Sequence, residues 1–297
     1  MSAGLLATAC ATISSATPAP KNGTVAVVAA ENEYGNVAAQ IGGRYVSVVS
    51  VESNPNTDPH VYEVSPGVAR DVADAQLVIQ NGAGYDDYMA KIESASSSAH
   101  RQVINVQRLL GLPDSTPNPH LWYSPTTMPA VAHQLAADLS RTQPSHAPYF
   151  RARAARFIAS LKPWTDAIAT FKTRHGGATA ATTEPVADYL LSAMGIDNLT
   201  PFQFQADIMN GVDPSPQDIT LENGFFTKHR VKVFLYNQQV VDALTISIRQ
   251  TAQNAGVPIV GVYETMPTPG YDYQSWMMAE VNAVEKAITG GTSTQHL

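Results

Sequence analysis

Two short histidine-containing segments of this sequence resemble each other. Asp58-Pro59-His60 is followed by Ser65-Pro66, and Asn118-Pro119-His120 is followed by Ser124-Pro125. A neutral imidazole can bind a metal ion through a ring nitrogen, and it can also hydrogen-bond to an organic solute. The plain alternative is a loop histidine that caps the next helix. The similarity of the two segments makes both histidines candidate binding residues. The strands and helices around them help to decide between ligand binding and helix capping.

The two histidines lie between predicted strands and helices. Short apolar, β-branched runs predict strands, and a Ser-Pro pair predicts a helix start because serine caps a helix and proline fits its first turn. The predicted strands are residues 24–30, 45–51, 77–80 and 103–106, and the predicted helices are 35–41, 86–96, 126–142 and one from Ser65-Pro66 onward. Such alternation favours a parallel sheet, in which ligands bind beyond the carboxyl ends of the strands. Both histidines are expected on such strand-to-helix loops.

A long helix separates this region from a second α/β region. Residues 145–174 carry apolar side chains three to four positions apart, and Pro163 should kink this helix or split it in two. Strands are then predicted at 231–236 and 259–263, and helices at 185–194, 241–254, 272–289 and from Ser215-Pro216 onward. The predicted fold is therefore α/β, with two lobes of mostly parallel sheets joined by one linker helix. The expected boundaries are residues 24–144, 145–174 and 175–297, with a frayed end after residue 289.

Composition and missing motifs exclude several classes of protein. Of the 297 residues, 44% are hydrophobic and 14% are charged, which is typical of a globular protein and not of a disordered one. The net charge is −7, and no basic stripe interleaved with aromatic residues appears, so nucleic acid is not an expected partner. HExxH, GxSxG and GxxxxGK[ST] motifs are missing, and Gly82-Ala83-Gly84 lacks the third glycine of a dinucleotide fingerprint. These absences disfavour an enzyme without excluding one.

The first 23 residues are expected to be an export segment. They are small and apolar, and Ala7-Thr8-Ala9-Cys10 resembles a bacterial lipobox, although the residue three positions before Cys10 is alanine and no basic region precedes it. The alternatives are an alanine-rich disordered tail or a start codon placed too late. Because Cys10 is the only cysteine, an intramolecular disulfide and a cysteine-rich metal site are excluded. No later segment approaches the roughly 20 apolar residues of a membrane span. We therefore expect an exported protein, with membrane association only through a lipid anchor at Cys10.

With this layout, the chain resembles the TroA/ZnuA-type metal-binding solute receptors of bacterial ABC importers for manganese and zinc. The resemblance extends from about Thr24 to Thr289. It is carried by four segments in the family's order: Asp58-Pro59-His60, Asn118-Pro119-His120-Leu121-Trp122, Thr183-Glu184-Pro185-Val186 and Val262-Tyr263-Glu264-Thr265. Each match alone is weak, but the four in order around a long helix are specific. The resemblance implies a monomer with metal bound in the cleft between two lobes, and delivery to an importer permease with its cytoplasmic ATPase.

The resemblance also implies four metal ligands. These are His60 and His120, Glu184 where members carry His or Glu, and Glu264 where Asp is commoner. Two neutral imidazoles and two carboxylates would balance one divalent ion, and affinity should fall in acid because protons compete for the ligands. If all four bind and a carboxylate is bidentate, no position stays open for a reactive water, which favours capture over catalysis. Since each lobe supplies two ligands, metal binding should favour the closed form.

The sequence leaves three points open. Asp58, Asn118 and Tyr123 could orient the histidines, but ordinary turn chemistry explains them equally well. A carboxylate-rich set leans toward manganese, with zinc close behind and iron(II) as a third candidate. The alternatives to metal capture are a metal-dependent hydrolase on a two-lobed scaffold, with Asp58 or Glu184 as general base, and a binding protein for a small organic solute.

Overall fold

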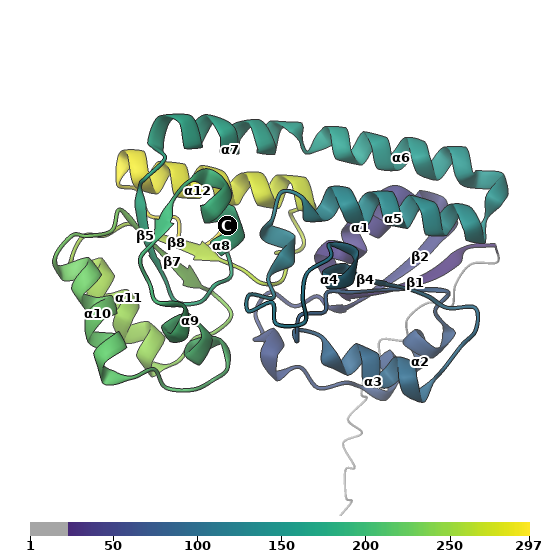
Figure 1. Cartoon of the computed structure of the whole chain (residues 1–297), viewed down its shortest axis with the longest axis horizontal. Helices are drawn as coiled ribbons and strands as arrows, with labels where there is room; N and C mark the ends of the chain where they lie inside the picture. The colour runs from purple at the N-terminus through teal and green to yellow at the C-terminus, as the bar shows by residue number, and fades with distance from the viewer. Residues whose placement is uncertain (1–22) are drawn as a thin grey trace, which may run out of the picture.

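The computed structural model describes residues 23–297, so Cys10 and the expected export segment lie outside the described residues. Two four-stranded sheets, of order β2-β1-β3-β4 and β6-β5-β7-β8, form the centres of two lobes that lie side by side (Figure 1). All strand pairs within both sheets are parallel. The predicted α/β class with two lobes is therefore confirmed. None of the helices in residues 23–297 combines the length and apolarity that crossing a bilayer requires.

The strands are short and the helices lie between them in sequence. The strands are β1 (Val25–Glu31), β2 (Val46–Glu52), β3 (Leu77–Gln80), β4 (Gln102–Asn105), β5 (Thr179–Thr182), β6 (Asp197–Asn198), β7 (Val233–Asn237) and β8 (Ile259–Val262). The α-helices are α1 (Asn32–Gly42), α2 (Pro66–Asp74), α3 (Asp87–Ala95), α4 (Val106–Leu109), α5 (Thr127–Thr142), α6 (Ala147–Ser160), α7 (Lys162–His175), α8 (Asp188–Met194), α9 (Phe202–Met209), α10 (Pro216–Thr227), α11 (Ala243–Asn254) and α12 (Tyr273–Gly290). Four 3-10 turns are η1 (Gly43–Tyr45), η2 (Pro59–Val61), η3 (Leu121–Tyr123) and η4 (Pro144–His146).

Strand periodicity divides the apolar side chains into layers. Alternate residues of a strand point to opposite faces of its sheet, so Val27 of β1 faces an inner core while Val28 faces an outer one. In the second sheet, Val233 faces the same inner core, and Phe234 faces a separate outer core beneath α9, α10 and α11. The inner core is continuous across both lobes and includes residues of α1, α5, α6, α7, α8 and α12. The two lobes are thus held together by a shared apolar layer.

The helix that spans the lobes has two parts. Helices α6 and α7 run along one side of both lobes, with α12 beside α7 (Figure 1). The helix breaks at Leu161, and Pro163 lies in the first turn of α7, as expected for a residue that lacks an N–H and crowds the preceding turn. Phe157 and Trp164, on either side of the break, are both buried in the inner core. The break therefore leaves the packing of the spanning helix intact.

One predicted helix cap is wrong, and four of the strands and α-helices were not predicted. The Ser65 and Ser215 side chains accept helix N–H groups, as predicted. Ser124 instead ends η3, and its hydroxyl lies 3.0 Å from the Thr126 hydroxyl. Thr126 is the N-cap of α5, so the predicted range of 126–142 for this helix is confirmed while the Ser124 cap is not. Strands β5 and β6 and helices α4 and α9 had no clear sequence signal. The β5 sequence, Thr-Ala-Ala-Thr, is half alanine, which is depleted in strands.

Glu280 of α12 is a buried carboxyl group whose hydrogen bonds join the two lobes, and its burial makes the stability of the protein depend on pH. Its carboxyl group is fully buried and accepts hydrogen bonds from Trp276 Nε1 (3.1 Å) and from the Tyr123 hydroxyl (3.3 Å) of the other lobe. Burial raises the pKa of Glu280 to about 8, although these two hydrogen bonds oppose the shift. The folded protein therefore keeps a proton that the unfolded chain loses above about pH 4.5. The stability that Glu280 contributes is fully present below that pH and is lost as pH rises through about 8.

We predict that Glu280→Gln removes part of this pH dependence. The free energy of unfolding of the metal-free wild type should fall, relative to the variant, by about 1–4 kcal/mol between about pH 5 and about pH 8.5. Denaturant titrations at both pH values measure this difference. Glu285→Gln, at a less buried position of the same helix, is the control. Parallel pH profiles for the wild type and Glu280→Gln would show that Glu280 is not the titrating group.

Candidate metal centre

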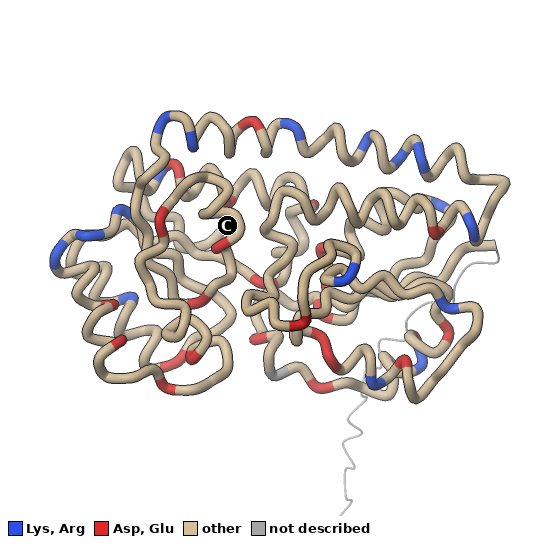
Figure 2. Tube along the Cα trace, in the orientation of Figure 1, with Lys and Arg blue, Asp and Glu red and all other residues tan. Residues whose placement is uncertain are grey.

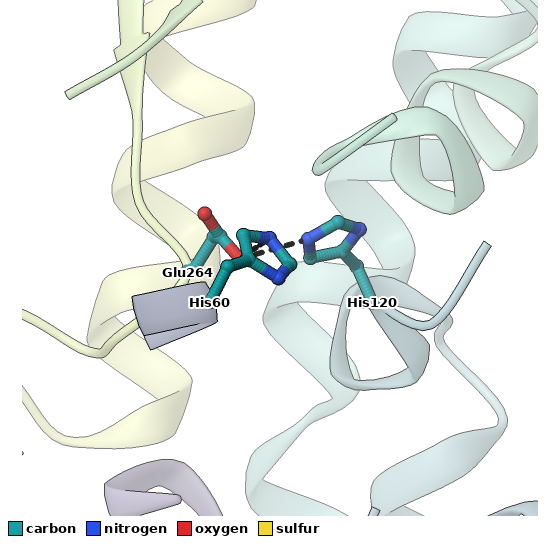
Figure 3. Close-up of side chains that lie close together, drawn as sticks. All are labelled: His60, His120 and Glu264. Atoms are coloured by element: carbon teal, nitrogen blue, oxygen red, sulfur yellow. Dashed lines mark hydrogen bonds and ion pairs between the residues drawn. The ribbon is translucent and has the colours of Figure 1, made fainter. Parts of the chain in front are cut away.

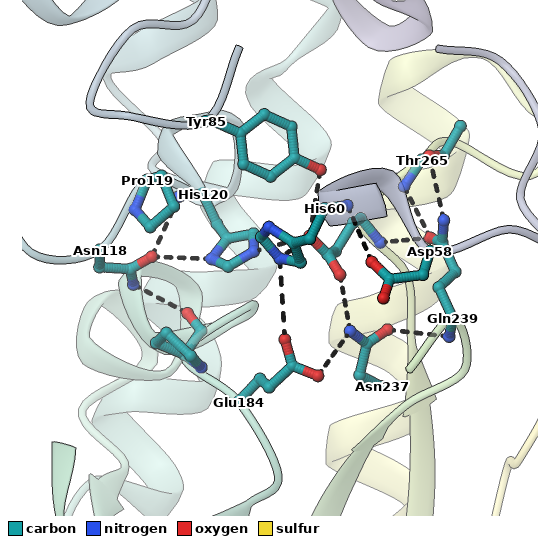
Figure 4. A network of polar contacts seen from close by, with 12 residues as sticks. Asp58, His60, Tyr85, Asn118, Pro119, His120, Glu184, Asn237, Gln239 and Thr265 are labelled. Carbon is teal, nitrogen blue, oxygen red and sulfur yellow. Dashed lines mark hydrogen bonds and ion pairs between the residues drawn. The ribbon is translucent and has the colours of Figure 1, made fainter. Parts of the chain in front are cut away.

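The four predicted ligands lie at the carboxyl ends of strands. His60 is on η2 after β2, and His120 immediately precedes η3, in the connection that follows β4 and α4. Glu184 follows β5, and Glu264 follows β8. Because all strands of a parallel sheet end at one edge, each lobe presents its two side chains at one edge. The two edges face each other, so residues far apart in sequence meet between the lobes (Figure 4).

Three of the four side chains are in direct contact. The Nε2 atoms of His60 and His120 each lie 3.1 Å from Glu264 Oε2 (Figure 3). One potential ligand atom from each of these residues lies within 4.8 Å of the others. Glu184 is more distant, with its Oε2 atom 4.0 Å from His60 Nε2. Donor atoms bound to one transition-metal ion at about 2.0–2.2 Å lie roughly 3 to 3.5 Å apart. His60, His120 and Glu264 therefore lie close enough to hold a single ion, whereas Glu184 lies farther from His60 than ligands of one ion do.

Two buried atoms of the set lack a hydrogen-bond partner. They are His60 Nε2, whose contact with Glu264 is not aligned as a hydrogen bond, and Glu184 Oε2. His60 Nε2 still has an ion-pair contact with Glu264, whereas Glu184 Oε2 has no hydrogen bond, so Glu184 Oε2 is the atom of the two with room for a further partner. A nitrogen and a carboxylate oxygen that face each other without a partner match the donor types that zinc and manganese accept.

Asn118 orients His120. The Asn118 Oδ1 atom accepts from the backbone N–H of His120 (3.0 Å) and from its ring Nδ1–H (2.8 Å). The Asn118 amide is itself oriented, because Nδ2 donates to the carbonyl oxygen of Pro185 in the other lobe (2.8 Å). This pairing fixes the imidazole tautomer and turns Nε2 toward Glu264, where it lies 3.1 Å from Oε2.

Asp58 and Tyr123 have other roles. Asp58 Oδ1 accepts from the backbone N–H of His60 (2.8 Å) and caps η2, which is turn chemistry. The Tyr123 hydroxyl donates to the carbonyl oxygen of Tyr263 (2.8 Å) and thereby joins the two lobes. Of the three residues whose roles the sequence left open, only Asn118 contacts an imidazole ring.

Sequence analysis missed three polar residues that surround the glutamates. Asn237, the last residue of β7, donates through Nδ2 to Oε1 of Glu184 (3.0 Å) and to Oε1 of Glu264 (2.7 Å) (Figure 4). Gln239 accepts the backbone N–H of Glu264 (2.7 Å), and the Tyr85 hydroxyl donates to Glu264 Oε2 (3.0 Å). The only available signal was that Asn237 and Gln239 follow a predicted strand of a parallel sheet, the place where ligands are bound.

Burial and pairing shift the pKa of every proposed ligand. Burial lowers the pKa of His60, but the Glu264 carboxylate outweighs it and raises the value to about 9. Burial lowers the pKa of His120, and both imidazoles together hold the pKa of Glu264 below its usual range against the effect of burial. Burial and the neighbouring Glu264 carboxylate raise the pKa of Glu184 well above its usual value. His60 and Glu184 therefore hold protons that a divalent cation must displace, and affinity should fall in acid.

Further carboxyl groups lie behind the site. Four such groups are buried: Glu31 and Glu52 end β1 and β2, Glu33 lies in the first turn of α1, and Asp86 precedes α3. Burial, aided by repulsion within the group, raises the pKa of Glu31 and Glu33 well above the usual value and that of Glu52 to about 8. Several acidic residues lie around the boundary between the lobes, whereas many basic ones lie along α6 and α7 and at the outer ends (Figure 2). This distribution favours a cation between the lobes.

A cleft of about 520 Å³ leads from solvent to the site. His60 and Tyr85 line it from one lobe, and residues 208–211 and 239–242 line it from the other. The His60 side chain is 20% exposed, whereas His120, Glu184 and Glu264 are 0% exposed. The Tyr85 ring lies against both imidazoles, with ring centroids 5.4 Å from His60 and 5.8 Å from His120. His60 is thus the first of the four that an ion arriving through the cleft would meet.

Comparison with known proteins agrees with this arrangement. The family described as the periplasmic zinc-uptake complex component A, ZnuA, matches residues 27–287. The chain belongs to this family. The resemblance drawn from four short segments is therefore confirmed, and the ZnuA match includes all four candidate ligands.

Individual ZnuA-like relatives are distant. The manganese-binding lipoprotein MntA of Bacillus subtilis is 29% identical over 142 residues, which is 46% of each chain. The zinc-binding protein AdcA of Streptococcus pyogenes serotype M1 is 26% identical over 171 residues, 52% of this chain and 30% of AdcA. This chain thus aligns with less than half the length of either relative. The periplasmic zinc-binding protein TroA of Treponema pallidum has the same fold, with a TM-score of 0.76 at 16% identity over 91% of this chain and 100% of TroA.

We predict that Asn118→Ala weakens metal binding about 10–100-fold, because His120 loses the acceptor that orients its ring. Competition titration with a chromophoric chelator measures the affinity. The control is Asn105→Ala in the same lobe, which removes the N-cap of α4 and touches no candidate ligand. Equal affinities for the two variants would contradict the orienting role.

Proposed function

We propose that this protein captures one divalent transition-metal ion, manganese or zinc, outside the cytoplasm and delivers it to an ABC importer. One observation carries the proposal. Four donor atoms, two from each lobe, converge between the lobes, and two of them are buried without a hydrogen-bond partner. A binding protein that closes on its cargo needs ligands from both lobes, because only then does the ion stabilise the closed form.

The proposed ligands are His60 and His120 through Nε2, and Glu184 and Glu264 through Oε2. Two carboxylates balance the charge of a divalent ion, and burial from water strengthens their attraction to it. Four protein ligands leave no obvious position for a reactive water, which a catalytic zinc site keeps open. Asp58 is also engaged by the backbone N–H of His60 and is poorly placed as a general base. We therefore favour capture over hydrolysis and regard the protein as non-enzymatic.

The relatives support the transport role. MntA is named a manganese-binding lipoprotein, and the family is described as part of a periplasmic zinc-uptake complex. By analogy, we propose that the partner of this chain is a permease with a cytoplasmic ATPase. We also propose that the protein is a monomer located outside the cytoplasm, with a lipid anchor if Cys10 is modified. We also propose residues 24–144 and 175–297 as the two lobes, residues 145–174 as their linker, and residues 1–23 as a processed segment.

A metal titration tests the proposal. We predict that chelator-stripped protein binds one zinc or manganese ion per chain and that its melting temperature rises, because an ion that binds only the folded state stabilises it by mass action. Calorimetry and thermal melting measure stoichiometry and stabilisation. Absence of binding by either ion would refute metal capture and favour an organic-solute receptor.

Ligand variants test the site. Removing a residue that only orients a metal ligand costs roughly 10–100-fold in affinity. We expect His60→Ala or His120→Ala to lose more than this, because each removes a ligand. Glu184→Ala and Glu264→Ala should also bind the metal weakly. His133→Ala, on the exposed face of α5, is the matched control and should bind as the wild type does. Wild-type affinity in both histidine variants would show that the site lies elsewhere.

A further inference from the structure

The number of carboxylate oxygens that face the ion decides its coordination number. Glu184 and Glu264 together have four oxygens, and His60 and His120 add one nitrogen each. Two monodentate glutamates would give four donors, whereas two bidentate ones would give six. Four N and O donors suit zinc, while manganese accepts carboxylate-rich sites of higher coordination. The groups that hydrogen-bond to the two carboxylates therefore influence which metal the site selects.

Asn237 holds one oxygen of each glutamate. Its Nδ2 atom lies 3.0 Å from Glu184 Oε1 and 2.7 Å from Glu264 Oε1 (Figure 4). The other oxygen of each glutamate, Oε2, lies toward His60 Nε2, at 4.0 Å for Glu184 and 3.1 Å for Glu264. For Oε1 of either glutamate to reach the ion, the carboxylate would have to turn, and this turn would break its bond to the buried amide.

The Asn237 amide has one orientation. Its Oδ1 atom accepts the backbone N–H of Gln239 (3.0 Å), a group that can only donate. The Nδ2 atom must therefore face the glutamates. The Asn237 backbone N–H donates to Thr183 Oγ1 (3.0 Å), next to Glu184 in sequence, and the residue is fully buried. These bonds fix the amide against rotation and keep its two N–H groups between the carboxylates.

Tyr85 restricts Glu264 further. Its hydroxyl donates to Oε2 (3.0 Å), the oxygen that faces both imidazoles. Tyr85 is placed there by a loop in which Gly82, Ala83 and Gly84 all have positive φ angles of 76°, 54° and 78°. This left-handed backbone is easily adopted by glycine and only rarely by alanine. Both oxygens of Glu264 thus carry a hydrogen bond from a fixed donor, and Oε2 alone is aimed at the histidines.

We infer that Asn237 is a positioning residue that keeps Glu184 and Glu264 monodentate and so makes the site four-coordinate and zinc-selective. This inference rests on the proposed function and goes beyond it. It also differs from the expectation of manganese, which rested on the carboxylate-rich set of ligands. Without the Asn237 amide, each carboxylate can turn and offer its second oxygen, which favours manganese relative to zinc.

The test uses Asn237→Ala and cobalt(II) as a spectroscopic probe. Four-coordinate cobalt(II) absorbs visible light strongly, and five- or six-coordinate cobalt(II) absorbs weakly, so the spectrum reports geometry and not merely affinity. We expect a strong band for the wild type and a weak one for Asn237→Ala. The ratio of zinc to manganese affinity should fall at least about tenfold in the variant. Circular dichroism and melting establish that the variant is folded.

Asn198→Ala is the matched control. The Asn198 amide also bridges two acceptors in the same lobe, Thr182 Oγ1 (3.1 Å) and Asp188 Oδ1 (2.9 Å), and neither belongs to a candidate ligand. This variant should keep the wild-type band and the wild-type affinity ratio. If Asn237→Ala does not fold, Asn237→Ser takes its place, and a weak wild-type band overturns the inference without any variant.

The outcomes separate this inference from the proposed function. A weak wild-type cobalt band, or a folded Asn237→Ala with an unchanged band and ratio, overturns the inference while metal capture stands. A wild type that binds none of zinc, manganese and cobalt overturns both. A strong band that is lost in Asn237→Ala and kept in Asn198→Ala, with the fall in affinity ratio, supports the role of Asn237.

Discussion

The Glu264 carboxylate is buried between two lobes, and its burial constrains much of the structure. Removing a charge from water is costly unless that charge is paired and hydrogen-bonded. Glu264 is fully buried and is contacted by His60, His120, Tyr85 and Asn237. Three of these partners come from the N-terminal lobe, so the pairing holds only while the lobes stay together. The shared inner core and the helices α6, α7 and α12 keep the two sheet edges at the required separation.

The two lobes contribute different chemistry to the site. The N-terminal lobe offers two imidazole nitrogens, and the C-terminal lobe offers two carboxylates separated by an amide. In the C-terminal lobe alone, Glu184 and Glu264 would repel each other, and the repulsion contributes to the raised pKa of Glu184. At the proposed site, a divalent ion would remove this repulsion and replace protons on His60 and Glu184. In the proposed account, selectivity depends on the groups that hold the ligands, Asn118 on one side and Asn237 on the other.

The sequence predicted the fold better than it predicted the site. Strand and helix order followed from periodicity, from serine caps at Ser65 and Ser215, and from Pro163, because these signals are local. His60 and His120 could be singled out because each lies in a recognisable Pro-His loop. The Ser124 prediction failed since the same Ser-Pro signal follows a 3-10 turn there and α5 starts later.

The remaining site residues depend on contacts that no local pattern encodes. Glu184 and Glu264 were identified only through the family resemblance, because a single glutamate in a loop carries no signal of its own. Asn237 and Glu264 are 27 residues apart in sequence, and Tyr85 and Glu264 are 179 apart. Their roles arise only when parallel strands bring their carboxyl ends to the same place.

The most direct test of the account is a crystal structure of the zinc-loaded protein with anomalous diffraction data collected across the zinc absorption edge. The account predicts one anomalous peak between the lobes, bonded to Nε2 of His60 and His120 and to one oxygen each of Glu184 and Glu264, with the Asn237 amide on the other two oxygens. A peak elsewhere, or one that lacks a ligand from either lobe, would contradict it.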